Sequence, residues 1–231
     1  MTTYRGNATA AGWFFIVAAV AAIAGLALYQ PALSDPAYVT SAGADGQVLL
    51  GGFLEMLLAA ACIGTAVALH PVVRQQSESI ALGYVCGRLL EAAVITTGIA
   101  ATLSLVTLRG RGASTEVARA LIAVHDWTFL LGPGLVIGVN SLLLAWLMYR
   151  SQLVPRWIAV LGLVGGPLVF ASSTAVLFGL YDDTSPWRFV AALPVAAWEL
   201  SLAVRLIARG FTRPLGHPPL PQLDGLARAG A

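Results

Sequence analysis

The chain has 231 residues, of which 58% are hydrophobic, while its 13 basic and 11 acidic residues make up only 10%. An ordinary soluble domain carries roughly 25% charged residues, so these few charges could not cover the surface of a soluble protein. Disorder is excluded too, because disordered chains are poor in apolar residues, and the mean hydropathy of +0.81 predicts a polytopic membrane protein.

A membrane-spanning helix needs about 20 mostly apolar residues. Six segments meet this requirement, at residues 11–29, 48–69, 80–108, 125–149, 157–180 and 189–208. The connections are short, so neighbouring helices should be antiparallel. Proline cannot continue the hydrogen-bond ladder of a helix, so the prolines between these segments are expected in or near loops. They are Pro31, Pro36, Pro71, Pro155 and Pro186.

The fourth span has two special features. Ser114 and Thr115 can cap a short helix, expected at residues 115–131, that starts at the membrane interface. The run Gly132-Pro133-Gly134 then predicts a kink inside the span. The expected fold is therefore all-α, a polytopic membrane bundle of six transmembrane helices. Its parts are a short N-terminus (1–10), the transmembrane domain (11–211) and a Pro-rich, poorly ordered tail (212–231).

Arginines in the loops predict the orientation through the positive-inside rule. With a cytoplasmic N-terminus, the inner side holds seven of them, namely Arg5, Arg74, Arg150, Arg156, Arg209, Arg213 and Arg228. The outer side then holds four, namely Arg109, Arg111, Arg119 and Arg188. We therefore expect both termini in the cytoplasm.

Several kinds of site are not expected. The largest arginine cluster is the pair Arg109 and Arg111, so there is no basic groove for nucleic acid. Two cysteines and three histidines lack the ligands for a closed zinc or iron–sulfur site. No metal and no cofactor are expected. Cys62 and Cys86 lie in apolar segments, which favours packing over a disulfide.

Charged residues inside the predicted spans are the main functional signal. Glu55 lies in the second span, Arg88 and Glu91 near the middle of the third, and Glu199 at the centre of the sixth. A charge at mid-bilayer costs at least ~2.5 kcal/mol, so it is rarely present without a reason. Arg88 and Glu91 are three residues apart, so they share a helix face and can pair. Further polar candidates are Tyr84 on the same face and His125, Asp126 and Asn140 in the fourth span.

The balance of charge in this set predicts a protonated carboxyl. Three glutamates and one aspartate face a single arginine, and four carboxylates cannot all ionise beside one cation in a low dielectric. A buried neutral carboxyl is a potential general acid. The alternative is structural, because interhelical polar pairs also stabilise membrane bundles by about 0.6 kcal/mol each. The pair of Arg88 and Glu91 alone is compatible with either interpretation.

Five ordered strings resemble the DUF4386 family, bacterial multi-pass membrane proteins described only as a domain of unknown function. The resemblance covers about residues 11–211. It implies about six spans in the bacterial cytoplasmic membrane and no established activity. The strings are GGFLEMLLA (51–59), LGYVCGRLLEAAVI (82–95), VHDWTFLLGPGLVIGVN (124–140), SQLVPRWIAVLGLVGGPL (151–168) and AWELSLAVRLIARGF (197–211).

The leading hypothesis is a cavity between the second, third, fourth and sixth spans that binds a small lipophilic molecule. Cofactor-free acid/base catalysis of the isomerase or cyclase type would use Glu55, Glu91 and Asp126 as catalytic residues. Ligand-binding residues would be Arg88, Glu199, Tyr84, His125 and Asn140. Besides this ligand, the expected partner is membrane lipid, and a homodimer is left open.

Two alternatives compete with this hypothesis, and the residues leave open whether the protein is an enzyme. A small proton-coupled exporter would use the same carboxylates to load and release protons. A non-catalytic binding or accessory protein would use them for specificity. An enzyme should have a cavity closed to one side of the membrane, an exporter needs access from both, and an accessory protein needs no cavity.

Overall fold

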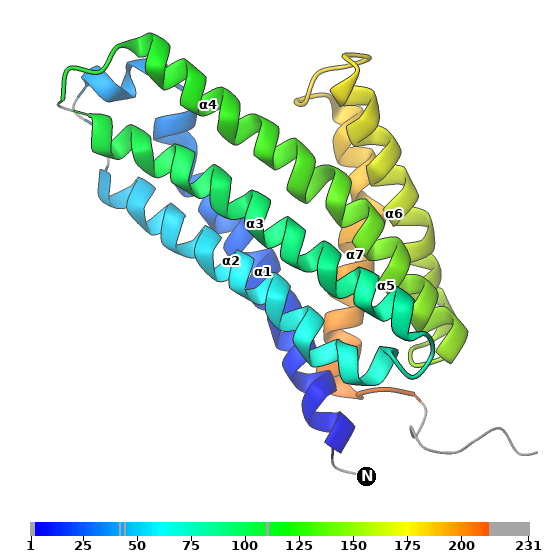
Figure 1. Ribbon diagram of the computed structural model, residues 1–231. Coiled ribbons are helices and arrows are strands. Elements are labelled where there is room, and N and C mark those ends of the chain that lie inside the picture. Colours follow the sequence, from blue (N-terminus) through cyan, green and yellow to red (C-terminus); the bar gives the residue numbers. More distant parts are fainter. Residues whose placement is uncertain (1–2, 42, 44, 110, 213–231) are drawn as a thin grey trace, which may run out of the picture.

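The computed structural model describes residues 3–41, 43, 45–109 and 111–212, and every regular element in this part of the chain is helical (Figure 1). Six of the helices are long and apolar enough to cross a membrane, as predicted. The elements are α1 (Thr3–Leu33), η1 (Pro36–Thr40), α2 (Asp45–Val73), α3 (Glu78–Leu108), α4 (Thr115–Phe129), η2 (Leu130–Val136), α5 (Ile137–Ser151), α6 (Arg156–Leu177) and α7 (Pro186–Ala208).

Most helices extend beyond the predicted spans. α1 already begins at Thr3, inside the segment expected as a short N-terminus. Pro31 and Pro71, which were expected in or near loops, lie near them, inside the C-terminal ends of α1 and α2. Each lies in the last turn, where the missing N–H removes a single backbone hydrogen bond and the helix ends two residues later. The predicted tail beyond Thr212 lies outside the described residues.

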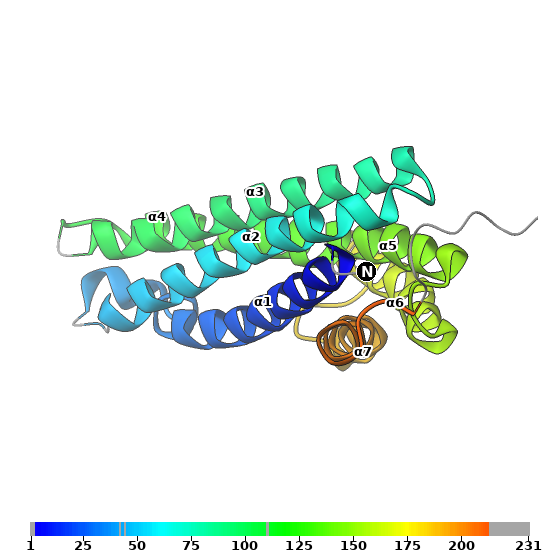
Figure 2. The same ribbon diagram turned by 90° about the horizontal axis from the view of Figure 1, so that it is seen from below.

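The fourth span is interrupted where Gly132-Pro133-Gly134 predicted a kink. Residues 130–136 form a π-helical segment between α4 and α5. Proline has no backbone N–H and interrupts the regular hydrogen bonds of an α-helix, and here the interruption takes the form of a π segment. The helix expected at the interface is continuous with this span, so that Thr115–Ser151 measures 37 residues. Its first part, α4, runs alongside α3 (Figures 1 and 2).

Glycines allow α6 to approach its two neighbours closely. A Cβ at Gly166 would lie 2.7 Å from the carbonyl oxygen of Gly138 in α5. At Gly162, it would lie 2.7 Å from the ring of Trp198 in α7. The spacing Gly162-x-x-x-Gly166 thus provides the close helix contact that its sequence predicted. It fixes α7, which carries Glu199, against the rest of the bundle.

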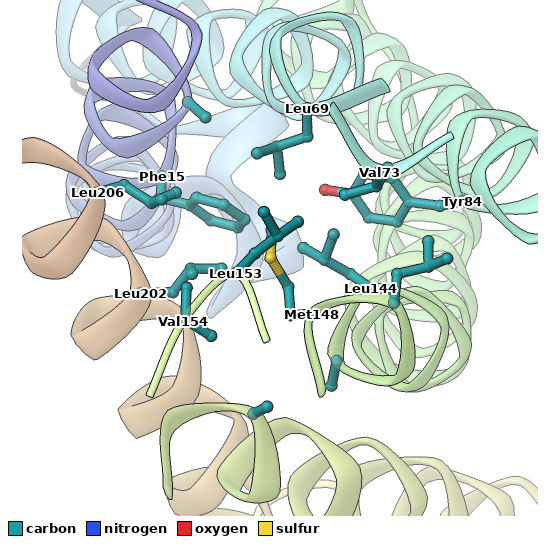
Figure 3. Close-up of a cluster of buried hydrophobic side chains, with 14 of the residues drawn as sticks. Phe15, Leu69, Val73, Tyr84, Leu144, Met148, Leu153, Val154, Leu202 and Leu206 are labelled. Atoms are coloured by element: carbon teal, nitrogen blue, oxygen red, sulfur yellow. The ribbon is translucent and has the colours of Figure 1, made fainter. Parts of the chain in front are cut away.

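A large apolar cluster fills one end of the bundle, which we call the N-terminal side. Figure 3 shows Phe15, Leu69, Met148, Leu202 and Leu206 converging there from different elements. Both ends of the described chain meet on this side, where the guanidinium of Arg5 donates to the Ile207 carbonyl (2.9 Å). The cluster therefore closes the bundle toward the N-terminal side.

The opposite end, the η1 side, is held by a polar clamp. Arg109 forms an ion pair with Asp45 and donates to the carbonyl oxygens of Ser41 (2.8 Å) and Gly43 (3.0 Å). Tyr38 donates its hydroxyl to Asp45 (2.6 Å). Burial, together with this bond, raises the pKa of Tyr38 to about 12. The phenol therefore stays a neutral donor at physiological pH, and the connection between α1 and α2 is tied to the end of α3.

Candidate functional site

Arg88 is the centre of the intramembrane charge cluster. Its side chain is only 4% exposed, and its two terminal nitrogens bind two different carboxylates. Nη1 lies 3.1 Å from Oε2 of Glu91, so the predicted pairing within α3 is confirmed. Nη2 lies 3.0 Å from Oε1 of Glu199, which comes from α7. One cation thus joins two glutamates that are far apart in the chain.

Neutral polar groups complete the surroundings of Arg88 and Glu91. The Nε of Arg88 donates to the Tyr84 hydroxyl (3.3 Å), which donates to Oγ1 of Thr65 (3.3 Å). The amide of Asn140 in α5 donates to Oε2 of Glu91 (2.8 Å). These bonds occupy most of the donors and acceptors that burial would otherwise leave without water. Two of the predicted ligand-binding residues, Tyr84 and Asn140, thus form hydrogen bonds with Arg88 and Glu91.

Helical periodicity explains why α3 can supply this cluster. Residues 84, 88, 91, 95, 98 and 102 recur at intervals of three or four and are all buried. Tyr84 and Arg88 are one turn apart, as are Arg88 and Glu91. The other face of α3 is apolar and exposed, including Leu82, Leu89 and Leu90. The face on which the sequence places Tyr84, Arg88 and Glu91 is therefore the inner face of the helix.

A cavity of about 270 Å³ lies beside the cluster. Arg88, Glu91, Glu199 and Glu55 form its polar wall, and the remaining lining is largely apolar. The apolar lining includes Phe15, Ala18, Ala19, Ala22, Ile23 and Leu26 of α1, Leu58 of α2, and Phe129, Pro133 and Ile137 of the fourth span.

The cavity opens on the flank of the bundle. Ile23 of α1 is 75% exposed, and the side chain of Glu199 in α7 is 24% exposed. Figure 1 shows α6 and α7 leaning away from the other helices toward the η1 side. Toward the N-terminal side, the apolar cluster of Figure 3 fills the interior. The opening therefore lies on the flank of the bundle, near Ile23 of α1 and Glu199 of α7.

Glu55 differs from the other two cavity glutamates. It lines the cavity, but it forms no ion pair or hydrogen bond within the described part of the chain. Glu55 therefore shares a cavity with Arg88 and Glu91, as the hypothesis of a common cavity expects, but it is not bonded to either. Gly25 of α1 lies directly opposite, where a Cβ would be 2.8 Å from Oε1 of Glu55 and 3.0 Å from its Cγ. The absence of a side chain at Gly25 makes room for this carboxyl.

We expect Gly25→Ala to displace Glu55 and to destabilise the protein by about 1–3 kcal/mol, the usual cost of overpacking. The exposed part of α1 offers a matched control in Gly6→Ala, because nothing lies within 4 Å of the added Cβ. That substitution should be neutral or slightly stabilising, since alanine favours a helix over glycine. Thermal unfolding in detergent compares the two, and equal melting temperatures would show that Glu55 adapts without cost.

The two adjacent predicted residues His125 and Asp126 point in different directions. His125 is buried and lines a second, smaller chamber together with Glu55. The side chain of Asp126 is 67% exposed and lies outside the lining of the cavity. Successive helix residues are about 100° apart, so only one of the two can face inward. The structure thus brings Glu55, Arg88, Glu91 and Glu199 to the cavity, places His125 next to it and leaves Asp126 at the surface.

Sequence reasoning missed the contribution of α1. This helix has no charged residue in its central part, yet it forms one wall of the cavity. Phe15 places its ring 5.6 Å from the Arg88 guanidinium carbon, a cation–π contact. From α2, Cys62 places its sulfur 3.8 Å from Nη1 of the same guanidinium. Both cysteines are free thiols, Cys62 buried and Cys86 exposed.

Comparison with known proteins gives a family and no activity. The family described as "Domain of unknown function (DUF4386)" matches residues 10–210, which includes every residue of the cluster and the cavity. No curated protein and no solved structure matches this chain. Because the match extends over most of the sequence, the chain belongs to the DUF4386 family.

Proposed function

We propose that the protein binds a small lipophilic molecule with one polar group, which it takes up sideways from the bilayer. The observation that carries this proposal is an apolar cavity with an arginine and three glutamates on one wall and an opening on the lipid-facing flank. Its volume is close to the lower end of the roughly 300–1,000 Å³ that ligand pockets occupy. An isoprenoid, quinone, fatty or aromatic compound matches this chemistry.

Acid/base catalysis fits the different surroundings of the glutamates. Glu91 and Glu199 each contact Arg88, which stabilises their ionised forms, whereas Glu55 has no such partner. A third negative charge beside one cation is unfavourable in a low dielectric, so Glu55 is the proton donor we assign. Its carboxyl would protonate one carbon of an alkene and, as a carboxylate, remove a proton from the allylic carbon. The double bond shifts, and no cofactor is needed.

The lateral opening of the cavity favours an enzyme or binding protein over the exporter. The N-terminal side of the bundle is filled by apolar side chains, so this conformation offers no path across. An exporter would need a second conformation, for which the π segment at Pro133 is the obvious hinge, because Pro133 lines the cavity. An accessory protein would need no cavity at all.

For the location, we propose the bacterial cytoplasmic membrane with the N-terminal side in the cytoplasm. Both ends of the described chain lie on this side, joined by the bond from Arg5 to Ile207. The loops there carry Arg74, Arg150, Arg156 and Arg209. The positive-inside rule then gives cytoplasmic termini.

Mass spectrometry of small molecules extracted from the purified protein tests the proposed binding. We expect one lipophilic compound with the wild type and at least about tenfold less with Glu91→Gln, a loss of about 1.4 kcal/mol in binding. Glu78→Gln makes the same chemical change at an exposed position of α3, far from the cavity, and should retain the compound. The proposal would be contradicted if all three proteins yielded only the same bulk lipids and no specific compound.

A further inference from the structure

A second chamber lies next to the cavity on its η1 side. It has a volume of about 20 Å³ and a partly polar lining that includes Tyr29, Glu55, His125 and Thr128. A volume of about 10–15 Å³ is enough for one water molecule when two to four polar groups surround it. The chamber is therefore the size of a water site and is too small for the lipophilic molecule of the main cavity.

The polar groups around this chamber have unused hydrogen-bonding capacity. The Tyr29 side chain is 1% exposed, and its hydroxyl has no hydrogen-bond partner among the described residues. Nδ1 of His125 lies 3.4 Å from Oδ1 of Asp126, which leaves Nε2 for the chamber. The rings of Tyr29 and His125 meet edge to face at 5.9 Å. Leaving a buried hydroxyl without a partner is costly, so this arrangement favours a bound water.

The chamber lies between the main cavity on one side and the exposed Asp126 on the other. Glu55, Phe129 and Pro133 line both the chamber and the main cavity. On the other side, His125 contacts Asp126, whose side chain is 67% exposed. Polar groups thus succeed one another from the surface at Asp126, through His125 and the chamber, to Glu55 at the cavity wall.

We infer that this series is a proton route from the η1 side of the membrane to Glu55. Nδ1 of His125 first takes up a proton at the surface beside Asp126. The resulting imidazolium gives its Nε2 proton to the chamber water, and that water gives a proton to the Glu55 carboxylate. The neutral ring is left with its proton on Nδ1 and returns to the Nε2–H tautomer before the next transfer. The Tyr29 hydroxyl holds the water in line between the imidazole and the carboxylate.

The titratable and charged groups near the route come from several helices. Tyr29 of α1, Arg88 and Glu91 of α3, His125 of α4 and Glu199 of α7 face the region of Glu55. Asp126 is next to His125. In addition, the Arg188 guanidinium carbon of α7 lies 5.5 Å from the ring of Phe129, which stacks on His125. The inference rests on the proposed function only for its purpose, which is to bring Glu55 into the protonated form that the proposed proton donor needs.

The test measures protonation of Glu55 without any ligand. Dicyclohexylcarbodiimide reacts with protonated carboxyls in apolar surroundings, and peptide mass spectrometry identifies the modified residue. The full chain is reconstituted in liposomes, and the pH is set separately on each side. Lowering the pH on the η1 side from about 8 to about 6, across the physiological range, should accelerate the labelling of Glu55 at least fivefold. The same change on the N-terminal side should have little effect.

Substitutions in the chamber distinguish the proposed proton route from unspecific leakage of protons across the membrane. Tyr29→Phe keeps the ring and its contact with His125, and His125→Gln replaces the imidazole by an amide that cannot relay protons. Both should abolish the fivefold response, whereas His70→Gln at the N-terminal end of the bundle should retain it. Arg111→Cys, tested with an impermeant maleimide, reports the orientation of the vesicles.

Two results would overturn the route. One is labelling that follows the pH of the N-terminal side, and the other is a Tyr29→Phe variant that responds like the wild type. Neither result would contradict the proposed binding of a lipophilic molecule. Conversely, sided labelling of Glu55 in a protein that carries no extracted compound would support the route and contradict the proposed function.

Discussion

Arg88→Ala is expected to destabilise the protein by about 3–5 kcal/mol, the usual cost of removing one partner from a buried ion pair. The loss is large because Glu91 and Glu199 would be left in the bundle without the cation that pairs with both of them. Glu91 is 4% exposed, so water cannot replace the guanidinium. The change also removes the contacts with Tyr84 and Phe15. Unfolding by heat or denaturant in mild detergent measures the difference.

Two comparisons show whether the charges are coupled. Arg74→Ala removes an exposed arginine in the connection between α2 and α3 and should change stability by less than about 0.5 kcal/mol. The triple variant Arg88→Met, Glu91→Gln, Glu199→Gln should recover most of the loss, because neutral groups of similar volume need no counterion. Glu91→Gln alone should fold normally, since a glutamine oxygen still accepts from Asn140. Small and equal losses in Arg88→Ala and Arg74→Ala would mean that the cluster is not coupled.

The sequence revealed the charged wall of the cavity but not its apolar wall. Arg88 and Glu91 were found because a charge inside a span is rare, and their pairing follows from local helix geometry. Glu199 was placed at a similar depth, but its bond to Arg88 depends on how α7 packs. In α1, lipid-facing and cavity-facing positions are both apolar, because lipid is as apolar as a protein interior. Sequence alone therefore could not tell Ala22, which lines the cavity, from Val20, which is exposed.

The structure of the fourth span could also be predicted only in part from the sequence. The proline and two glycines predicted the interruption correctly, because its cause is local. The helix expected from residue 115 does begin at Thr115 with Ser114 as its N-cap, and it continues directly into the span. Its residues pack along α3, the helix that precedes them in the chain. The rotation of the same helix decides that His125 faces inward and Asp126 outward, and this required the structure.

The second large effect is expected at Gly165, where α6 meets α7. A Cβ at this position would lie 2.5 Å from the backbone nitrogen of Val195 and 2.8 Å from the carbonyl carbon of Pro194. Backbone atoms cannot move aside as a flexible side chain can, so Gly165→Ala must push the two helices apart. We expect a loss of about 3 kcal/mol, the upper end of overpacking costs, although alanine itself is the better helix former. Gly83→Ala in α3 meets only Leu143, at 3.6 Å, and should be neutral or stabilising.

This substitution also tests how α7 holds the site. Pro194 and Val195 lie about one turn before Glu199, so moving this part of α7 should separate the Glu199 carboxylate from Arg88. In a double-mutant cycle, Glu199→Gln should then cost less in the Gly165→Ala background than in the wild type, with a coupling of at least about 0.5 kcal/mol. Additive effects would mean that Glu199 follows Arg88 by adjusting its own side chain. In that case Arg88, and not the contact between α6 and α7, would determine the position of the Glu199 carboxylate in the cavity.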